Sequence, residues 1–284
     1  MRPGREAIVS FDQSVSEHYT HGELLGAIQS AVAKLGKSIE SVSIDDLAPV
    51  DEFHIGGRLA TDNLLDQLNF SESDHILDVG CGLGGASRYI ASKYSNRVTG
   101  IDLTQEYIEV GKELSAWVGL DKQVSLYQGS ALAMPFKDEA FDGAVMMHVG
   151  MNIDDKGRLF AEVYRVLRRG ASFGVYDIMQ INNGELAYPV PWATDDTTSK
   201  LATPGHYEQA LTHVGFKVGT HNTRRDFALG FFRQLRQKTE ASGGPPPLGL
   251  HLLMQESTAV KFKNMVDNIT ADLIAPVEII AQKQ

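Results

Sequence analysis

The chain of 284 residues is 43% apolar and 22% charged, which is ordinary for a globular protein with one large domain or a core and a small cap. Its formal net charge of −10 argues against nucleic acid as a partner, because phosphate backbones require a basic surface. No apolar run approaches the roughly 18 residues that a membrane span needs, and the N-terminal residues lack the apolar core of a signal peptide. The single cysteine, Cys81, cannot form an intrachain disulfide, so we expect a reduced, cytoplasmic setting.

The N-terminal block contains helical patterns and no convincing strand. Apolar residues recur at helical spacing over 22–36, Ser43 begins a short helical turn, and residues 57–69 form a further helix. Because these helices precede the first strand, we expect residues 1–70 to pack on the core as a helical lid.

From residue 74 the sequence alternates between strands and helices. The predicted strands are 75–79, 97–101, 123–127, 143–147 and 172–178, and the predicted helices are 85–94, 105–118 and 156–167. Such alternation is typical of a parallel sheet covered by helices on both faces.

The C-terminal third departs from this alternation. It predicts a helix over 203–214, a strand over 217–220, helices over 224–239 and 257–268 around the breaker GGPPPLG, and a last strand over 275–281. We expect a core over residues 71–223, a helical cap insertion over 224–270 and a final core strand within 271–284.

A glycine-rich turn, DVGCGLGG, follows the first predicted strand. Gly80, Gly82 and Gly84 allow the backbone to come close to a ligand, and the next helix offers unpaired N–H groups at its start. The same glycines, with Gly85 in place of Gly84, also match the G-x-G-x-x-G of dinucleotide enzymes. The turn alone therefore leaves NAD and S-adenosylmethionine open.

Two carboxylates bear on that choice. Asp102, twenty positions after Gly82, can accept hydrogen bonds from both ribose hydroxyls of either cofactor. Asp78, two positions before the first glycine, can meet the ammonium group of S-adenosylmethionine, whereas it would repel a pyrophosphate. The alternative for Asp78 is that it only caps the turn.

Four motifs in this order, LDVGCGLGG, GIDLT, the G-x-A-x-x-x-P-F loop from Gly129 and FDGAVMMHVGMNI, carry a family resemblance. The sequence resembles class I S-adenosylmethionine-dependent methyltransferases, in the small-molecule group with sterol, tocopherol, quinone and glycine-betaine pathway enzymes. The resemblance covers roughly residues 51–184 and extends more weakly to the last strand. It implies an α/β fold with a Rossmann-like sheet of seven strands, mostly parallel with the last strand antiparallel, and helical caps from both ends.

The resemblance also implies a cofactor site. The glycines would approach the methionine part, Asp102 the ribose, and Leu103 and the Ala131 N–H the adenine. Many relatives have an aspartate where this chain has Ser130, which accepts a hydrogen bond without the charge. The predicted cofactor-binding residues are His54, Asp78, Gly80, Gly82, Gly84, Asp102, Leu103, Ser130, Ala131 and His148.

Candidate catalytic residues follow the fourth and fifth strands. His148 suits a proton acceptor. The alternatives are that it lines the cofactor or substrate site, or that it does neither. Asp177 could take a proton, orient His148, meet a cationic substrate or cap the chain. Tyr19, with His21 and His54, could close over the cofactor as an N-terminal latch, with the Tyr19 ring or hydroxyl facing a sulfonium.

Substrate residues are expected nearby. Asn152 stands where some relatives have a catalytic histidine and, since an amide is no base, we assign it a positioning role. The predicted substrate-binding residues are Met147, Met151, Asn152, Tyr176 and Trp192. The methionines and the aromatic residues of the C-terminal insertion favour a partly apolar acceptor. The histidines show no ligand-like spacing, so no metal is expected.

The sequence thus predicts an enzyme that transfers a methyl group from S-adenosylmethionine to a small, partly apolar molecule on carbon, nitrogen or oxygen. Two alternatives stay open, an NAD-dependent oxidoreductase and a non-methylating protein that retains the cofactor fold. A homodimer is compatible with the sequence, and neither nucleic acid nor a membrane span is expected.

Overall fold

The computed structural model describes residues 5–20 and 22–284, with side chains from residue 12 onward except at 21 and 220. His21, a predicted latch residue, lies outside the described residues. Helix α1 (Arg5–Tyr19) occupies a stretch for which the sequence analysis predicts no element. No helix within the described residues is both long and apolar enough to cross a membrane.

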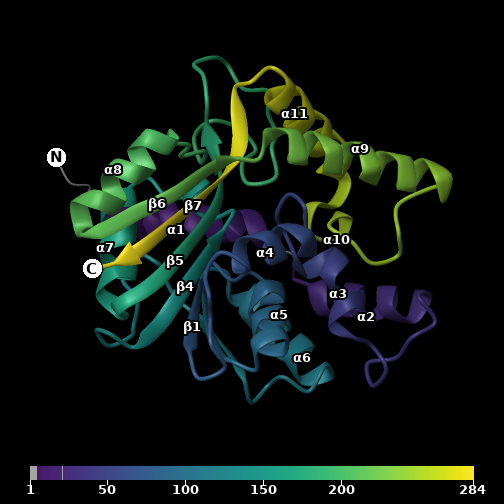
Figure 1. Cartoon of the computed structure of the whole chain (residues 1–284). Coiled ribbons are helices and arrows are strands. Elements are labelled where there is room, and N and C mark those ends of the chain that lie inside the picture. Colours follow the sequence, from purple (N-terminus) through teal and green to yellow (C-terminus); the bar gives the residue numbers. More distant parts are fainter. Residues whose placement is uncertain (1–4, 21) are drawn as a thin grey trace.

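The centre of the fold is one sheet of seven strands in the order β3-β2-β1-β4-β5-β7-β6 (Figure 1). The strands are β1 (His75–Val79), β2 (Arg97–Asp102), β3 (Val124–Gln128), β4 (Phe141–Met147), β5 (Leu167–Gln180), β6 (Phe216–Thr223) and β7 (Ile274–Lys283). Strand β7 runs antiparallel to both of its neighbours, β5 and β6, whereas the pairs among β1 to β5 are parallel. The predicted seven-stranded, mostly parallel sheet with an antiparallel last strand is confirmed.

Helices cover both faces of the sheet, as the run of buried apolar residues in β1 predicts. On one face, Leu77 and Val79 pack with α7 (Lys156–Val166) and α8 (Pro204–Val214). On the other face, Ile76 packs with α4 (Arg58–Leu65), α5 (Gly85–Tyr94) and α6 (Gln105–Trp117). The alternation of neighbouring β1 residues between the two layers follows from the two-residue period of a strand.

Helices of the N-terminal block pack beside the sheet against the helical segment that lies between β6 and β7. Helices α2 (Leu24–Lys34) and α3 (Ile44–Asp51) share one apolar cluster with α10 (His251–Met254). Helices α9 (Arg225–Ala241) and α11 (Thr258–Thr270) precede and follow α10 in the sequence and lie near it (Figure 1). Helix α3 begins at a capping box, in which Ser43 and Asp46 each bond the other's backbone N–H. Two short 3-10 turns follow other elements: η1 (Gly150–Asn152) comes after β4 and η2 (Gln255–Ser257) after α10.

Apart from α1, α10 and the two 3-10 turns, which the sequence analysis does not predict, the structure differs from the prediction at the ends of elements. Helix α4 stops at Leu65, where residues 57–69 were expected to be helical, and β5 begins at Leu167 rather than at residue 172. The early part of β5 is largely exposed and rich in arginine, so it lacks the apolar pattern that identifies a buried strand.

Candidate functional site

A cavity of about 600 Å³ lies at the carboxyl ends of β1, β2 and β4. In a parallel α/β sheet this edge, where the strand order reverses beside β1, is the usual place for a ligand. Helices α1, α9 and α11 supply further walls through Tyr19, Phe231 and Phe262. The cavity thus lies between the sheet edge and helices from both ends of the chain.

The glycine turn forms one wall of this cavity. Gly80 and Gly82 line it, and both have positive φ angles, +71° and +53°. A Cβ atom at Gly80 would lie 2.4 Å from the Val149 side chain, so only glycine fits there. Gly84 is not among the described residues that line the cavity, because it forms the N-cap of α5 with its φ of +79°.

Asp102 lies at the end of β2 with its carboxylate fixed by the backbone. Oδ2 accepts a hydrogen bond from Gly82 N and Oδ1 one from Thr104 N, both at 2.9 Å. Each carboxylate oxygen keeps a further lone pair for a ligand hydroxyl.

Asp78 is almost fully buried beside the turn and also lines the cavity. Its Oδ2 accepts a hydrogen bond from Ser87 Oγ at 2.6 Å. Burial, with a smaller contribution from the acidic groups Glu52 and Asp102, raises the pKa of Asp78 to about 7, although the hydrogen bonds from Ser87 counteract this. A cation bound next to this carboxyl would therefore be stabilised.

Leu103, Ser130 and Ala131, which the sequence analysis assigns to the adenine, all line the cavity. Asp12 of α1 joins them there, and burial raises the pKa of its carboxyl while the Ser130 hydroxyl counteracts this by hydrogen bonding. The sequence analysis missed Asp12 because it predicts no helix in this stretch. Asp12 thus supplies a carboxyl group beside Ser130, the position at which many relatives carry an aspartate.

His148 follows β4 and lines the cavity in the left-handed region, with φ at +55°. Its backbone N donates to Tyr176 O at 2.7 Å, and its ring lies 5.0 Å from that of Tyr176. The Nε2 atom is buried and has no hydrogen-bond partner among the described residues. Burial, together with His54, holds the pKa of His148 well below its usual range, so the ring is neutral.

Tyr176 and Asp177 are not among the described residues that line the cavity. The Tyr176 hydroxyl donates to Ile55 O at 2.9 Å. Asp177 Oδ2 accepts from Gly150 N at 2.7 Å and from the Tyr207 hydroxyl at 2.8 Å, and burial raises the pKa of Asp177 to about 6. These contacts hold the loop after β4 in place, so both residues support the wall from behind.

Three predicted residues form a chain of hydrogen bonds across the cavity. The Tyr19 hydroxyl donates to Asn152 Oδ1 at 3.2 Å, and Asn152 Nδ2 donates to Trp192 O at 3.1 Å. Trp192 is buried, and its Nε1 donates to Ser199 Oγ at 3.0 Å. Asn152 therefore positions the end of α1 and the Trp192 segment on each other.

Another part of the lining is apolar. It includes Ile55, Met147, Met151, Ile178, Trp192, Phe231, Phe232, Leu250, Leu253, Phe262 and Met265, while Asp51, Asp154, Asp155, Arg158 and Lys200 add charged side chains to the lining. The phenylalanines come from α9 and α11, the helices of the C-terminal insertion. Within the described ranges, no three His, Cys, Asp or Glu side chains are grouped so as to hold a metal ion.

Residues 77–175 match the family model of a methyltransferase domain, which runs from β1 to β5 and includes the glycine turn, Asp102 and His148. The chain contains a methyltransferase domain. This confirms the family resemblance drawn from the four motifs. The match to a methyltransferase rather than to a dinucleotide enzyme also resolves the double interpretation of the glycine turn.

Curated relatives match part of the chain. The methyltransferase GfsG of Streptomyces halstedii is 29% identical over 171 residues, which make up 60% of this chain and 59% of the relative. A sterol 24-C-methyltransferase of Eremothecium gossypii is 30% identical over 171 residues, or 57% of this chain and 45% of the relative. The chain spans between 35% and 59% of the length of the first curated relatives that it matches.

Solved structures share the fold over almost the whole chain. Phosphoethanolamine N-methyltransferase 2 of Haemonchus contortus, in complex with S-adenosyl-L-methionine, aligns with a TM-score of 0.73 at 18% identity, over 99% of this chain and 62% of that one. The cyclase SpnF aligns with a TM-score of 0.68 at 19% identity, over 96% of each chain.

Proposed function

We propose that the protein transfers a methyl group from S-adenosylmethionine to a small, largely apolar acceptor. The observation that carries this proposal is the buried Asp78 carboxyl beside the glycine turn, whose charged neighbours are acidic. The methionine end of the cofactor carries an ammonium group and a sulfonium, and both positive charges would offset this cluster of carboxylates. A pyrophosphate at the same place would be repelled, which disfavours NAD.

The other cofactor parts fit the rest of the cavity. Asp102 has lone pairs available for the ribose hydroxyls, and Leu103 and Ala131 lie where the adenine would bind. Asp12 and Ser130 together would accept the hydrogen bonds of the adenine amino group. When bound, the cofactor supplies an electrophilic methyl group on a good leaving group, so the protein has mainly to align the acceptor and to exclude water.

The acceptor would occupy the apolar part of the lining, against Trp192, Met151 and the phenylalanines of α9 and α11. A sterol 24-C-methyltransferase among the relatives is compatible with an apolar acceptor. Tyr19 and the other α1 residues would close over the cofactor as the latch that the sequence predicts. The division into an N-terminal lid, core and C-terminal insertion belongs to this proposal.

We also propose a cytoplasmic location, on the basis of a single cysteine, Cys81, which leaves this chain without an intrachain disulfide. Assembly as a homodimer stays a prediction. Sedimentation of the purified protein measures the assembly directly, and fractionation of the native cells measures the location.

Calorimetry with S-adenosylhomocysteine tests the cofactor assignment, with NADH as the competing ligand. We expect micromolar binding of the first and none of the second. Methyl transfer is then measured as radioactive label moved from S-adenosylmethionine to a panel of apolar alcohols, amines and alkenes. Absence of S-adenosylhomocysteine binding would refute the proposal, whereas binding without any methylated product would favour a non-methylating protein that retains the cofactor fold.

A further inference from the structure

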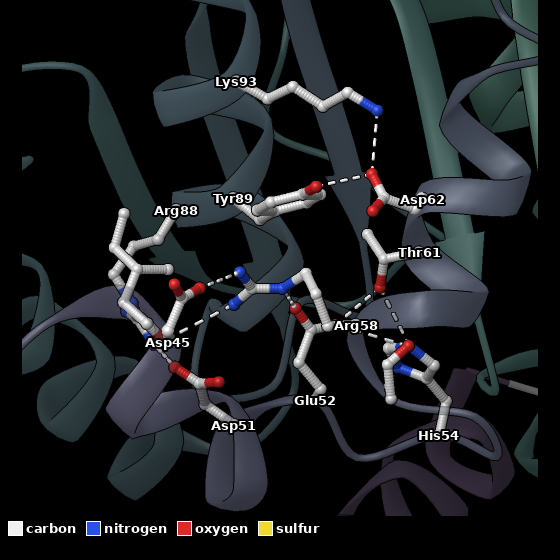
Figure 2. Close-up of polar contacts among 12 residues, drawn as sticks. Asp45, Asp51, Glu52, His54, Arg58, Thr61, Asp62, Arg88, Tyr89 and Lys93 are labelled. Carbon is white, nitrogen blue, oxygen red and sulfur yellow. Dashed lines mark hydrogen bonds and ion pairs between the residues drawn. The ribbon is translucent and has the colours of Figure 1, made fainter. Parts of the chain in front are cut away.

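A buried polar network lies behind the cavity wall, between α3 and α4 (Figure 2). Its centre is Glu52, whose side chain is fully buried. Glu52 Oε1 accepts a hydrogen bond from Arg58 Nε, and Oε2 accepts one from the Thr61 hydroxyl, both at 2.5 Å. Arg58 in turn lies over the Tyr89 ring at 4.0 Å, which ties the network to α5. The carboxylate is thus held on both of its oxygens.

His54 is attached to this network through one ring nitrogen. Its Nε2 lies 3.0 Å from Thr61 Oγ1, 3.2 Å from Gly57 O and 3.3 Å from Glu52 Oε2. Figure 2 shows the imidazole next to Thr61 and Glu52. Among the described residues, all contacts of His54 in this network use Nε2, and none uses the other ring nitrogen, Nδ1.

The partners of Nε2 determine the tautomer of His54. Gly57 O and the Glu52 carboxylate can only accept hydrogen bonds, and the proton of the Thr61 hydroxyl is already donated to Glu52. Each of the three groups therefore presents a lone pair to Nε2. This nitrogen must carry the hydrogen, which leaves the lone pair of the neutral ring on Nδ1.

His54 also lines the cavity, next to His148, which lines it too, and to Tyr176, which lies behind the wall. Its ring centroid lies 6.0 Å from that of His148 and 6.2 Å from that of Tyr176. The charged and titratable groups that face it are Glu52, Arg58, His148 and Tyr176. Burial lowers the pKa of His54, although Glu52 counteracts this, so the ring is neutral at pH 7 and its lone pair is available.

His148 also lines the cavity and its ring is also neutral, so the two histidines differ in their contacts. The Nε2 atom of His148 is buried without a partner among the described residues, and no carboxylate fixes its tautomer. Its contacts are to the Tyr176 ring and the Tyr176 carbonyl, which suit a wall residue. The choice between the two histidines therefore favours His54 as the proton acceptor.

We propose that His54, and not His148, is the catalytic base, and that the acceptor carries an O–H or N–H group in an apolar frame. Glu52 and Thr61 act as positioning residues that fix the tautomer and stabilise the imidazolium. This inference rests on the proposed methyl transfer. The bond between the acceptor oxygen or nitrogen and the methyl carbon forms as the carbon–sulfur bond breaks, and its electron pair stays on the sulfur. The acceptor proton passes to His54 Nδ1 and leaves to solvent with the product.

The first test is independent of any acceptor. Nitrogen-15 NMR of the full-length protein reports which ring nitrogen of each histidine is protonated, and the signal lost in H54Q identifies His54. We expect hydrogen on Nε2 and a lone pair on Nδ1 at pH 7, with and without S-adenosylhomocysteine. Hydrogen on Nδ1, or a charged ring at pH 7, would overturn the proposal.

Variants of the network test the role of the positioning residues. T61V removes the hydroxyl but leaves Gly57 O and Glu52 Oε2 to accept from Nε2, so we expect the same tautomer with a shifted Nε2 signal, whereas T61S keeps the hydroxyl and the wild-type spectrum. D62N is the matched control, because Asp62 is the next residue of α4 but bonds Tyr89 and Lys93 (Figure 2). A wild-type spectrum in T61V would contradict the assigned role of Thr61.

The second test uses the acceptor panel described above. We expect alcohols or amines as substrates, and H54Q to lower kcat by about 100-fold or more, the typical contribution of a general base. The affinity for S-adenosylhomocysteine should stay within about twofold of the wild-type value, since the ring bonds no part of the cofactor in this assignment. Equal kcat in H54Q, or methylation of alkenes alone, would overturn the assignment. Failure of S-adenosylhomocysteine to bind the wild-type protein would refute the methyl transfer itself, while the NMR result would still decide the tautomer.

Discussion

Tyr19 and Asn152 lie 133 positions apart in the sequence, and the hydroxyl of the first donates a hydrogen bond to Oδ1 of the second at 3.2 Å. This contact joins the end of α1 to the loop after β4. His18 adds a second contact, because its Nε2 lies 3.1 Å from Pro191 O. The N-terminal helix is therefore attached to the same two segments that line the cavity.

Tyr19→Phe should loosen α1 without emptying its aromatic contacts with Phe53 and Tyr107. Loss of one hydrogen bond costs about 0.5–1.5 kcal/mol, so α1 should open more often. Limited proteolysis should cut residues 5–20 several-fold faster in the variant. Tyr127→Phe is the control, since this tyrosine is 48% exposed and its ring packs against Phe136 of the described chain. Equal cleavage rates in the two variants would count against the latch.

Asp78→Asn should raise the stability of the ligand-free protein at high pH. The pKa of Asp78 in the folded state, about 7, lies above the unfolded value, so the folded protein binds more protons between these two pH values. The free energy of unfolding therefore falls as pH rises from about 4 to about 7, by an amount on the order of 2 kcal/mol or more. The asparagine variant should lack this decrease in chemical denaturation curves.

The same variant should bind S-adenosylhomocysteine more weakly, because an amide offers no charge to the ligand ammonium. In the wild-type protein the affinity should fall as pH falls below about 7, since protonation of Asp78 neutralises the carboxylate. Asp121→Asn, at an exposed position, serves as the control. Affinity that does not change with pH in the wild-type protein would remove Asp78 from the site.

Asp102→Ala should weaken S-adenosylhomocysteine binding by roughly 1–3 kcal/mol, through loss of a charged hydrogen-bond acceptor. The substitution also leaves the backbone N–H groups of Gly82 and Thr104 without their acceptor, because both donate hydrogen bonds to this carboxylate in the wild-type protein. Calorimetry should show the loss, while Asp226→Ala, at a side chain that is 97% exposed, should bind as the wild-type protein does. Unchanged affinity in Asp102→Ala would place the ribose elsewhere.

Asp12→Ala should reduce discrimination at the adenine end. The wild-type protein should prefer S-adenosylhomocysteine over its inosine analogue, which lacks the amino group, by roughly 1–3 kcal/mol. The variant should lose most of that preference, because the carboxyl next to Ser130 is gone. Competition binding measures both ligands in parallel. A preference that survives in the variant would assign adenine recognition to Ser130 and the backbone alone.

The sheet could be predicted from the sequence because its strands are short apolar runs between turn residues, and β1 matches the predicted range residue for residue. The alternation of strand side chains between the two faces does not predict which of them line the cavity. Tyr176 and Asp177 end a strand at the ligand edge, yet each packs into a layer beside the sheet, one on Ile55 and the other on Tyr207. Their position in the sequence does not distinguish a lining residue from one behind the wall.

The rest of the site depends on contacts between distant segments. Asp12 reaches the cavity only because α1 packs across it, and the sequence analysis predicts no helix there. The bond between Thr61 and Glu52, nine positions apart, depends on how the chain turns between α3 and α4. A local pattern of residue types carries no record of such approaches, so the sequence offers His148, beside the strand, as a candidate proton acceptor and does not single out His54 for that role.

Helix α1 contributes a residue to each end of the cavity, Asp12 next to Ser130 and Tyr19 next to Asn152. Displacement of this one helix would expose the adenine end and the acceptor end at the same time. We therefore expect the spent cofactor and the methylated product to leave in one event, whose rate follows how often α1 detaches.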